Sequence, residues 1–324
     1  YSPGELVDYT AQTGDTLPAL AARFNTTTAA ILEANSFIPA GATTMPEGMP
    51  MKIPIYYLPL WGPAYLILPD SLFVNGPAQV GFDTAAFVAS QPGWLRQYSA
   101  YAADAQRSGA EIIDVVARNY SVSPRLLLAL LEYQAGALSA PTLDPALEVY
   151  PLGYEAYDHQ GLYLQLNWAA NLLNNGYYAW RRGELLQLEL KSGRSERLDP
   201  WLNAASASLH HYFNQLLPAA DYPSAIAHDG LAQVYRQLFG DPWHAAVAHI
   251  PGSLVQPEMV LPMELGETWA FTGGPHTGWG VGEPLAALDF APPMEGDACA
   301  TAPNWATASA AGVIVRSETG QVMI

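Results

Sequence analysis

Two residues near the C-terminal end of the sequence are of types that bind zinc. His276 lies in a segment rich in glycine and proline, and Asp289 follows 13 residues later. A neutral imidazole nitrogen and a carboxylate oxygen are both good zinc ligands, and a catalytic zinc ion usually takes three protein ligands and one water. No histidine follows Asp289. The pair therefore predicts part of a hydrolytic zinc site without its third protein ligand.

The sequence around this pair resembles the lysostaphin-type zinc endopeptidases, and among them the β-lytic metalloendopeptidases. The resemblance is carried by GGPHTGWGVGEPLAALDFA and WATASAAGVIVR. It implies that His276 and Asp289 are the first two zinc ligands, that a later H-x-H motif supplies the third, and that the complete domain cuts peptide cross-bridges of bacterial walls. We expect zinc binding to be weak or absent in this chain and the chain to be inactive as an enzyme. The alternative for the pair is a hydrogen-bonded loop contact.

A second candidate site lies in the first 55 residues, where the pattern predicts a strand, two short helices and a second strand. The segments YTAQTGDTLPALAARFNTTTAAILEAN and EGMPMKIP resemble the LysM domain. LysM modules bind glycans that contain N-acetylglucosamine, such as peptidoglycan or chitin, between the first strand–helix loop and the loop after the second helix. The glycan-binding residues implied by the resemblance are Gly14, Asp15, Thr16, Leu17, Asn35 and Ile38. The alternative is that Asp15 only caps a helix and Asn35 only ends one.

The middle of the chain predicts an all-α domain. Its candidate helices span residues 95–118, 124–137, 160–181, 200–217 and 231–239, and Ser123–Pro124 and Asp199–Pro200 are typical helix starts. The segment VSPRLLLALLEYQAG resembles the helix of lysozyme-like lytic transglycosylases that carries the catalytic glutamate.

The position of that catalytic glutamate is occupied here by Gln134. An amide cannot donate and recover a proton at neutral pH, so it cannot act as a general acid. Glu132 lies two residues earlier and points about 200° away around the helix, so it cannot take over this role. We expect a lysozyme-like domain that spaces the two ends of the chain or binds a glycan without cutting it.

Composition limits the partners. The chain has 324 residues, half of them hydrophobic, and a net charge of −17. So many uncompensated acidic groups disfavour nucleic acid, which is bound through clustered cations. The longest apolar stretch, residues 53–69, contains four prolines and predicts an extended linker rather than a membrane span.

The predicted fold class is therefore multidomain α+β. A small βααβ LysM module covers residues 1–55, a Pro-rich extended linker 56–84, an all-α lysozyme-like domain 85–248, and an incomplete, mostly-β metallopeptidase domain 249–324. In the last domain we predict strands over residues 308–315 and 321–324. An incomplete sheet exposes unpaired strand backbone, so we expect the last strand to pair with a C-terminal fragment or another chain.

These features together predict a secreted bacterial protein, extracellular or attached to the cell wall, that binds peptidoglycan and is related to zinc endopeptidases that cut peptidoglycan peptides. The alternative is a non-catalytic wall-binding or assembly subunit built from degenerate hydrolase domains. A processed product, a shortened polypeptide and a natural truncation remain three explanations for the missing part. The lone Cys299 is either a buried apolar residue or lacks a partner that lies elsewhere.

Overall fold

The computed structural model describes residues 1–56, 61–293, 302–314, 316–318 and 320–324. Two compact units form within these ranges. The first comprises residues 1–254 with the segment Gly278–Pro284, and the second comprises Val255–Thr277 and Leu285–Ile324. Helices and two-stranded antiparallel sheets are mixed, which agrees with the predicted α+β class. Cys299 lies outside the described residues.

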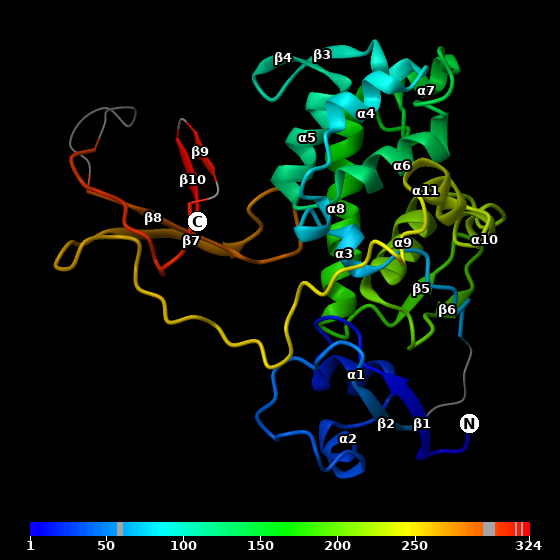
Figure 1. Cartoon of the computed structure of the whole chain (residues 1–324), viewed down its shortest axis with the longest axis vertical. Helices are drawn as coiled ribbons and strands as arrows, with labels where there is room; N and C mark the ends of the chain where they lie inside the picture. The colour runs from blue at the N-terminus through cyan, green and yellow to red at the C-terminus, as the bar shows by residue number, and fades with distance from the viewer. Residues whose placement is uncertain (57–60, 294–301, 315, 319) are drawn as a thin grey trace. The chain divides into compact units, whose positions relative to one another are not determined.

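The N-terminal part of the first unit has the predicted strand–helix–helix–strand order (Figure 1). Its elements are β1 (Glu5–Thr10), α1 (Leu17–Arg23), α2 (Thr28–Ala34) and β2 (Pro50–Ile55). The two helices begin after Thr16 and Thr27, whose hydroxyls accept hydrogen bonds from backbone N–H groups three residues on. Alternate residues of the antiparallel pair β1–β2 point inward, so Val7 and Ile53 meet in a core that α1 and α2 cover.

The rest of the first unit is mainly helical. Its helices are α3 (Asp70–Phe73), α4 (Thr84–Ser90), α5 (Gly109–Tyr120), α6 (Pro124–Ala135), α7 (Pro145–Val149), α8 (Leu162–Arg181), α9 (Ala204–Leu216), α10 (Tyr222–Ala225) and α11 (Leu231–Phe239), with 3₁₀ turns η1 (Pro77–Gln79), η2 (Trp94–Arg96) and η3 (Tyr157–His159). The longest helix, α8, packs against α5 and α9, and α6 packs against α11. One continuous apolar core results.

Two predicted helix starts are wrong. The predicted helix over residues 95–118 is interrupted by the hairpin β3 (Ser99–Ala102) and β4 (Ala105–Ser108), and only α5 follows. Ala103 and Asp104 take positive φ at the turn of this hairpin, which a helix does not allow. The helix predicted from residue 200 begins at Ala204, after the N-cap Asn203. A second small hairpin, β5 (Gln187–Glu189) with β6 (Ser195–Arg197), adds strands to a part predicted to be all-α.

The predicted extended linker over residues 56–84 differs in its second half. Ile67, Leu68, Leu72 and Phe73 are buried in the helical core, and α3 lies within this stretch. This half therefore contributes to the core of the helical part instead of separating two domains.

The second unit consists of strands and irregular segments. Its strands are β7 (Ala270–His276), β8 (Ala287–Ala291), β9 (Arg316–Glu318) and β10 (Gln321–Met323), which pair as two antiparallel hairpins. Residues 308–314 are not in a strand, unlike the prediction. None of the residues of this unit whose exposure is described is buried. Strand β10 pairs with β9 on one side. The pairing of β10 with a further chain stays a prediction.

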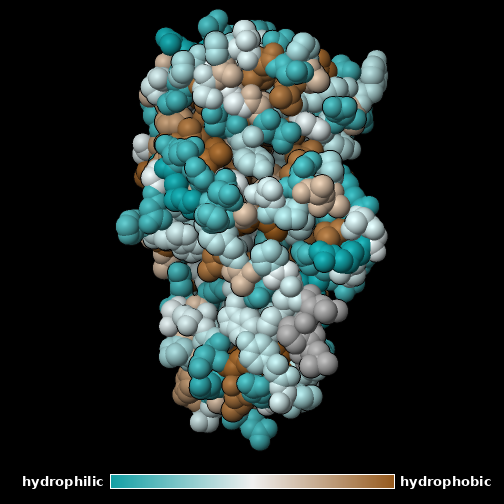
Figure 2. Space-filling view, turned by 90° about the vertical axis from the view of Figure 1, so that its right-hand side faces the viewer, coloured by the Kyte–Doolittle hydropathy of each residue, from teal (hydrophilic) through white to brown (hydrophobic). Residues whose placement is uncertain are grey.

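The surface is mixed in polarity. On the face drawn in Figure 2, hydrophobic residues are scattered among polar ones rather than gathered in one patch. None of the helices in the described ranges is both long and apolar enough to cross a bilayer.

Candidate functional site

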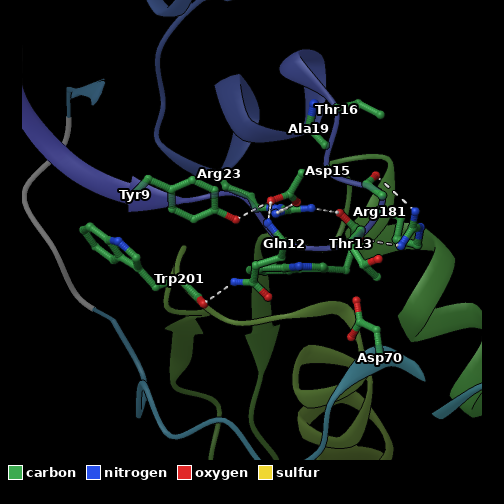
Figure 3. Close-up of polar contacts among 12 residues, drawn as sticks. Tyr9, Gln12, Thr13, Asp15, Thr16, Ala19, Arg23, Asp70, Arg181 and Trp201 are labelled. Carbon is green, nitrogen blue, oxygen red and sulfur yellow. Dashed lines mark hydrogen bonds and ion pairs between the residues drawn. The ribbon is translucent and has the colours of Figure 1, made fainter. Parts of the chain in front are cut away.

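The loop between β1 and α1 contains most of the predicted glycan-binding residues. Asp15 is buried, and its carboxylate accepts hydrogen bonds from the Tyr9 hydroxyl at 2.6 Å and the Gln12 backbone N–H at 2.8 Å. The Arg23 guanidinium pairs with the other carboxylate oxygen at 2.9 Å. Burial, with the nearby Asp15, raises the pKa of Tyr9 well above its usual range. Asp15 thus links β1, the loop that follows it and α1 inside the module (Figure 3).

The remaining predicted side chains are also used inside the module. Leu17 and Ile38 are buried in its core, and the Thr16 hydroxyl caps α1. The side chain of Asn35 donates to the carbonyls of Ile31 and Lys52 and accepts from the Lys52 N–H at 2.8 Å. These side chains position two loops, and little of them is left exposed to a ligand.

The same loop contacts the C-terminal end of α8. Arg181 donates to the backbone carbonyls of Thr13 at 3.1 Å and Gly14 at 3.0 Å. Gly14 has φ +68°, and a Cβ atom there would lie 1.5 Å from the Arg181 guanidinium, so this contact requires glycine. Arg23 extends from α1 to the Trp180 carbonyl, and Arg197 extends from β6 to the carbonyl of Ala22. The module is therefore packed onto the helical part by buried and half-buried arginines.

Phe37 was not singled out from the sequence. It lies between Asn35 and Ile38 in the loop after α2, and 62% of it is exposed. Exposed aromatic rings offer an apolar face on which a sugar ring can stack. An aromatic residue inside a loop that resembles a glycan-binding segment was the signal that could have identified it.

The predicted zinc ligands are brought together in the second unit. His276 ends β7 and Asp289 lies in β8, where it is paired with Gly273. The distance from His276 Nε2 to Asp289 Oδ2 is 2.7 Å, and His276 Nδ1 lies 2.7 Å from the Thr277 carbonyl oxygen. About half of each side chain is exposed. The hydrogen bond to the Thr277 carbonyl raises the pKa of His276, and Asp289 raises it further.

This pair fits two ligands of a zinc site. A hydrogen bond from Nδ1–H to a backbone carbonyl is the usual way to orient a zinc-binding histidine and leaves Nε2 for the metal. Tetrahedral ligands at about 2.0–2.1 Å from zinc lie about 3.3 Å apart, so Nε2 and Oδ2 must separate slightly from their direct contact. Among the described residues no group of three or more His, Cys, Asp or Glu side chains is placed to hold a metal. The described residues would thus offer two zinc ligands, and a catalytic zinc site stays a prediction.

Glu132 and Gln134, the two candidate positions for a glycan-cleaving acid, lie at the end of α6. The Glu132 carboxylate accepts hydrogen bonds from the backbone N–H groups of Leu138 at 2.8 Å and Ser139 at 3.2 Å. The side chain of Gln134 packs against Gly153. Glu132 thus holds the chain that follows the helix, and a lysozyme-like origin of this part stays a prediction.

Comparisons with known proteins identify both halves of the first unit. Residues 9–54 match the family model of the LysM domain, and residues 66–252 match the one described as LasA, N-terminal domain. The chain is also similar to the Protease LasA of Pseudomonas aeruginosa strains UCBPP-PA14 and ATCC 15692. Each is 27% identical over 269 residues, which cover 80% of this chain and 58% of the relative. The match thus spans little more than half the length of these relatives. No solved structure matches the chain.

Proposed function

The chain belongs to the family of the LasA N-terminal domain, and from this premise we propose that it is a secreted bacterial protein that binds peptidoglycan through its first unit. The observation that supports this proposal most is the LysM module, whose family match over residues 9–54 coincides with the β1–α1–α2–β2 fold. Proteins with this module bind glycans that contain N-acetylglucosamine, so the glycan strand is the part of the wall that we expect to be recognised.

The second unit is proposed to be part of a zinc endopeptidase domain that acts on wall peptides. Two observations support this role. His276 and Asp289 lie side by side with one ring nitrogen oriented by a carbonyl, as zinc ligands are, and the relatives are named as proteases. In a complete site, a zinc ion would polarise the peptide carbonyl and activate water.

The LysM loops are proposed to contact the glycan mainly through backbone groups and Phe37. Gly14, Asp15, Thr16, Leu17, Asn35 and Ile38 remain the proposed loop positions. Their side chains, however, hold the loops in shape and are largely covered. Phe37 is the exposed aromatic residue of the second loop.

Co-sedimentation with purified insoluble peptidoglycan tests wall binding. We expect the full chain to pellet with the walls and Phe37→Ala to pellet less. Tyr101→Ala removes a similarly exposed ring from the β3–β4 hairpin and is expected to pellet like the native chain. A native chain that stays in the supernatant would refute the proposed function.

A second candidate function is a wall-binding or assembly role without hydrolysis. It is favoured by the direct hydrogen bond between His276 Nε2 and Asp289 Oδ2, the two atoms that would otherwise bind a metal. Elemental analysis and a peptide-release assay separate the two candidates. Near-stoichiometric zinc together with peptides released from peptidoglycan supports the protease. Wall binding without zinc and without release supports the second candidate.

A further inference from the structure

A cleft lies within the first unit between the LysM module and the helical part. It has a volume of about 490 Å³, within the range of roughly 300–1,000 Å³ that is typical of small-molecule pockets. One wall is formed by β1 and the residues after it, and another by the stretch around α3 and Trp201. The third wall is the segment that follows α11 and includes Trp243.

This third wall is held at both ends. The Val247 N–H donates to the Ser71 hydroxyl at 3.1 Å on α3. Farther along, the Ser253 N–H donates to the Thr44 carbonyl at 2.8 Å, and the Thr44 hydroxyl donates to the Pro251 carbonyl. The segment therefore runs from the helical part to the LysM module and closes one side of the cleft. Hydrogen bonds at Val247, Pro251 and Ser253 thus fix the position of this segment.

Polar groups without a full set of partners face this cleft. Asp70 is buried, and its Oδ1 accepts from the Ala205 N–H at 2.8 Å. Its Oδ2 has no hydrogen-bond partner within the described ranges, and Figure 3 shows the carboxylate pointing from α3 toward the Gln12–Thr13 segment. Thr13 also lines the cleft, is only 7% exposed, and its hydroxyl has no partner among the described residues. Buried polar groups of this kind are normally satisfied, so a ligand or water is expected to bind them.

The lining chemistry selects the class of ligand. Two tryptophans, Trp201 and Trp243, line the cleft together with apolar residues such as Leu66. Among the residues that the structure describes, three carboxylates also line it, but no lysine or arginine does. The absence of lysine and arginine from the described lining disfavours phosphates and other anions. Such a lining suits an uncharged pyranose sugar. The indole rings can stack on the apolar face of the sugar ring, and the carboxylate and amide oxygens can accept hydrogen bonds from its hydroxyl groups.

We propose that this cleft binds an uncharged pyranose unit of a glycan strand, with Trp243 against the ring face and Asp70 accepting a sugar hydroxyl. The proposal rests on the proposed function for its source of glycan and adds a second contact beyond the LysM loops. Neither the LysM module nor the helical part forms this cleft alone, because residues of both line it. Asp70 is positioned for the role by the start of α9, which holds its other oxygen.

Isothermal titration calorimetry with chitotetraose, an uncharged N-acetylglucosamine tetramer, tests the cleft. The native chain is expected to bind, and Trp243→Ala is expected to weaken binding about tenfold because it removes one aromatic contact. Asp70→Asn keeps an oxygen for the Ala205 N–H and replaces the second carboxylate oxygen, so a severalfold loss is expected. Trp305→Ala is the matched control, since Trp305 is exposed and does not line the cleft.

The outcomes separate this proposal from the proposed function. Native binding that is unaltered in both cleft variants overturns the cleft, while wall co-sedimentation by the native chain keeps the proposed function. Binding of the cationic glucosamine tetramer but not of chitotetraose also overturns it, because the ligand would then be a cation. Trp243 is 42% exposed, so its removal is expected to leave the melting temperature unchanged, and Asp70→Asn provides an independent second variant.

Discussion

The two units of this protein contain similar hairpins with different surroundings. In the first unit, the inward residues Val7 and Ile53 of the β1–β2 pair are buried under α1 and α2. In the second unit, Phe271 and Leu288 of the β7–β8 pair are 58% and 56% exposed. Local sequence is sufficient to pair two strands, but an isolated hairpin is only marginally stable in water until another element covers it. The difference shows that strand patterning and core formation are separate properties of this sequence.

Ion pairs show the same contrast. The side chains of Asp15 and Arg23 are 4% and 3% exposed, whereas His276 and Asp289 are each about half exposed. Removing one member of a buried pair leaves an uncompensated charge, while exposed pairs contribute little to stability. The first pair is thus expected to maintain the fold, and the second is free to exchange its partner for a metal.

The largest expected effect is that of Arg23→Ala. It leaves Asp15 without its cation and removes the contact with the Trp180 carbonyl, so the free energy of unfolding should fall by about 3–5 kcal/mol. His276→Ala, its counterpart in the exposed pair, should cause no measurable change. Urea unfolding followed by circular dichroism measures both variants. Equal losses would remove the distinction between the two pairs.

A slightly smaller effect is expected from a core leucine. Leu166 on α8 is fully buried, and Leu166→Ala should lower the free energy of unfolding by about 2–5 kcal/mol. Leu288→Ala on the exposed face of β8 should change it by less than about 0.5 kcal/mol. The same urea experiment applies. A large loss at Leu288 would show that the second unit has a core that covers this strand.

Asp70 gives the third effect, which depends on pH. Burial raises the pKa of Asp70 to about 6. The Ala205 N–H, Arg181 and Arg23 oppose this increase, and Asp15 adds to it. Between about pH 4 and pH 6 the folded state holds a proton that the unfolded state releases, so the free energy of unfolding decreases as pH rises through this window.

Asp70→Asn removes this pH-dependent loss. The free energy of unfolding of Asp70→Asn minus that of the native chain should increase by on the order of 2–3 kcal/mol from pH 4 to pH 8. Unfolding curves at several pH values measure this difference. Asp104→Asn, at an exposed turn, is the control and should show no such trend. A parallel pH dependence for native and Asp70→Asn proteins would refute the assignment.

Much of the fold follows from local sequence signals. The strand–helix–helix–strand order of the LysM module and the helices α6 and α11 agree with the prediction. Their signals are local, since α6 has the Ser123–Pro124 start and α11 ends at Gly240. The β3–β4 hairpin was missed, since its turn depends on positive φ at Ala103 and Asp104, residues that carry no glycine signal. The burial of Ile67 and Leu68 was missed because prolines dominate that stretch, and only packing against distant helices reveals its role.

The candidate sites were predicted in part. The spacing of His276 and Asp289 predicted that they lie together, and the structure places them in direct contact. The contact of Arg181 on α8 with the β1–α1 loop could not be predicted, because it joins residues 167 positions apart in the sequence. The cleft with Trp243 and Asp70 was missed for the same reason. Sites built from one segment are visible in the sequence, whereas sites shared by several segments need the fold.

The most direct test of the central claim is co-sedimentation with insoluble peptidoglycan for the native chain, Trp243→Ala, and the double variant His276→Ala with Asp289→Ala. Because binding is assigned to the first unit, the native chain and the double variant should pellet equally, and Trp243→Ala should pellet less. A native chain that does not pellet, or a double variant that alone loses binding, would contradict the account.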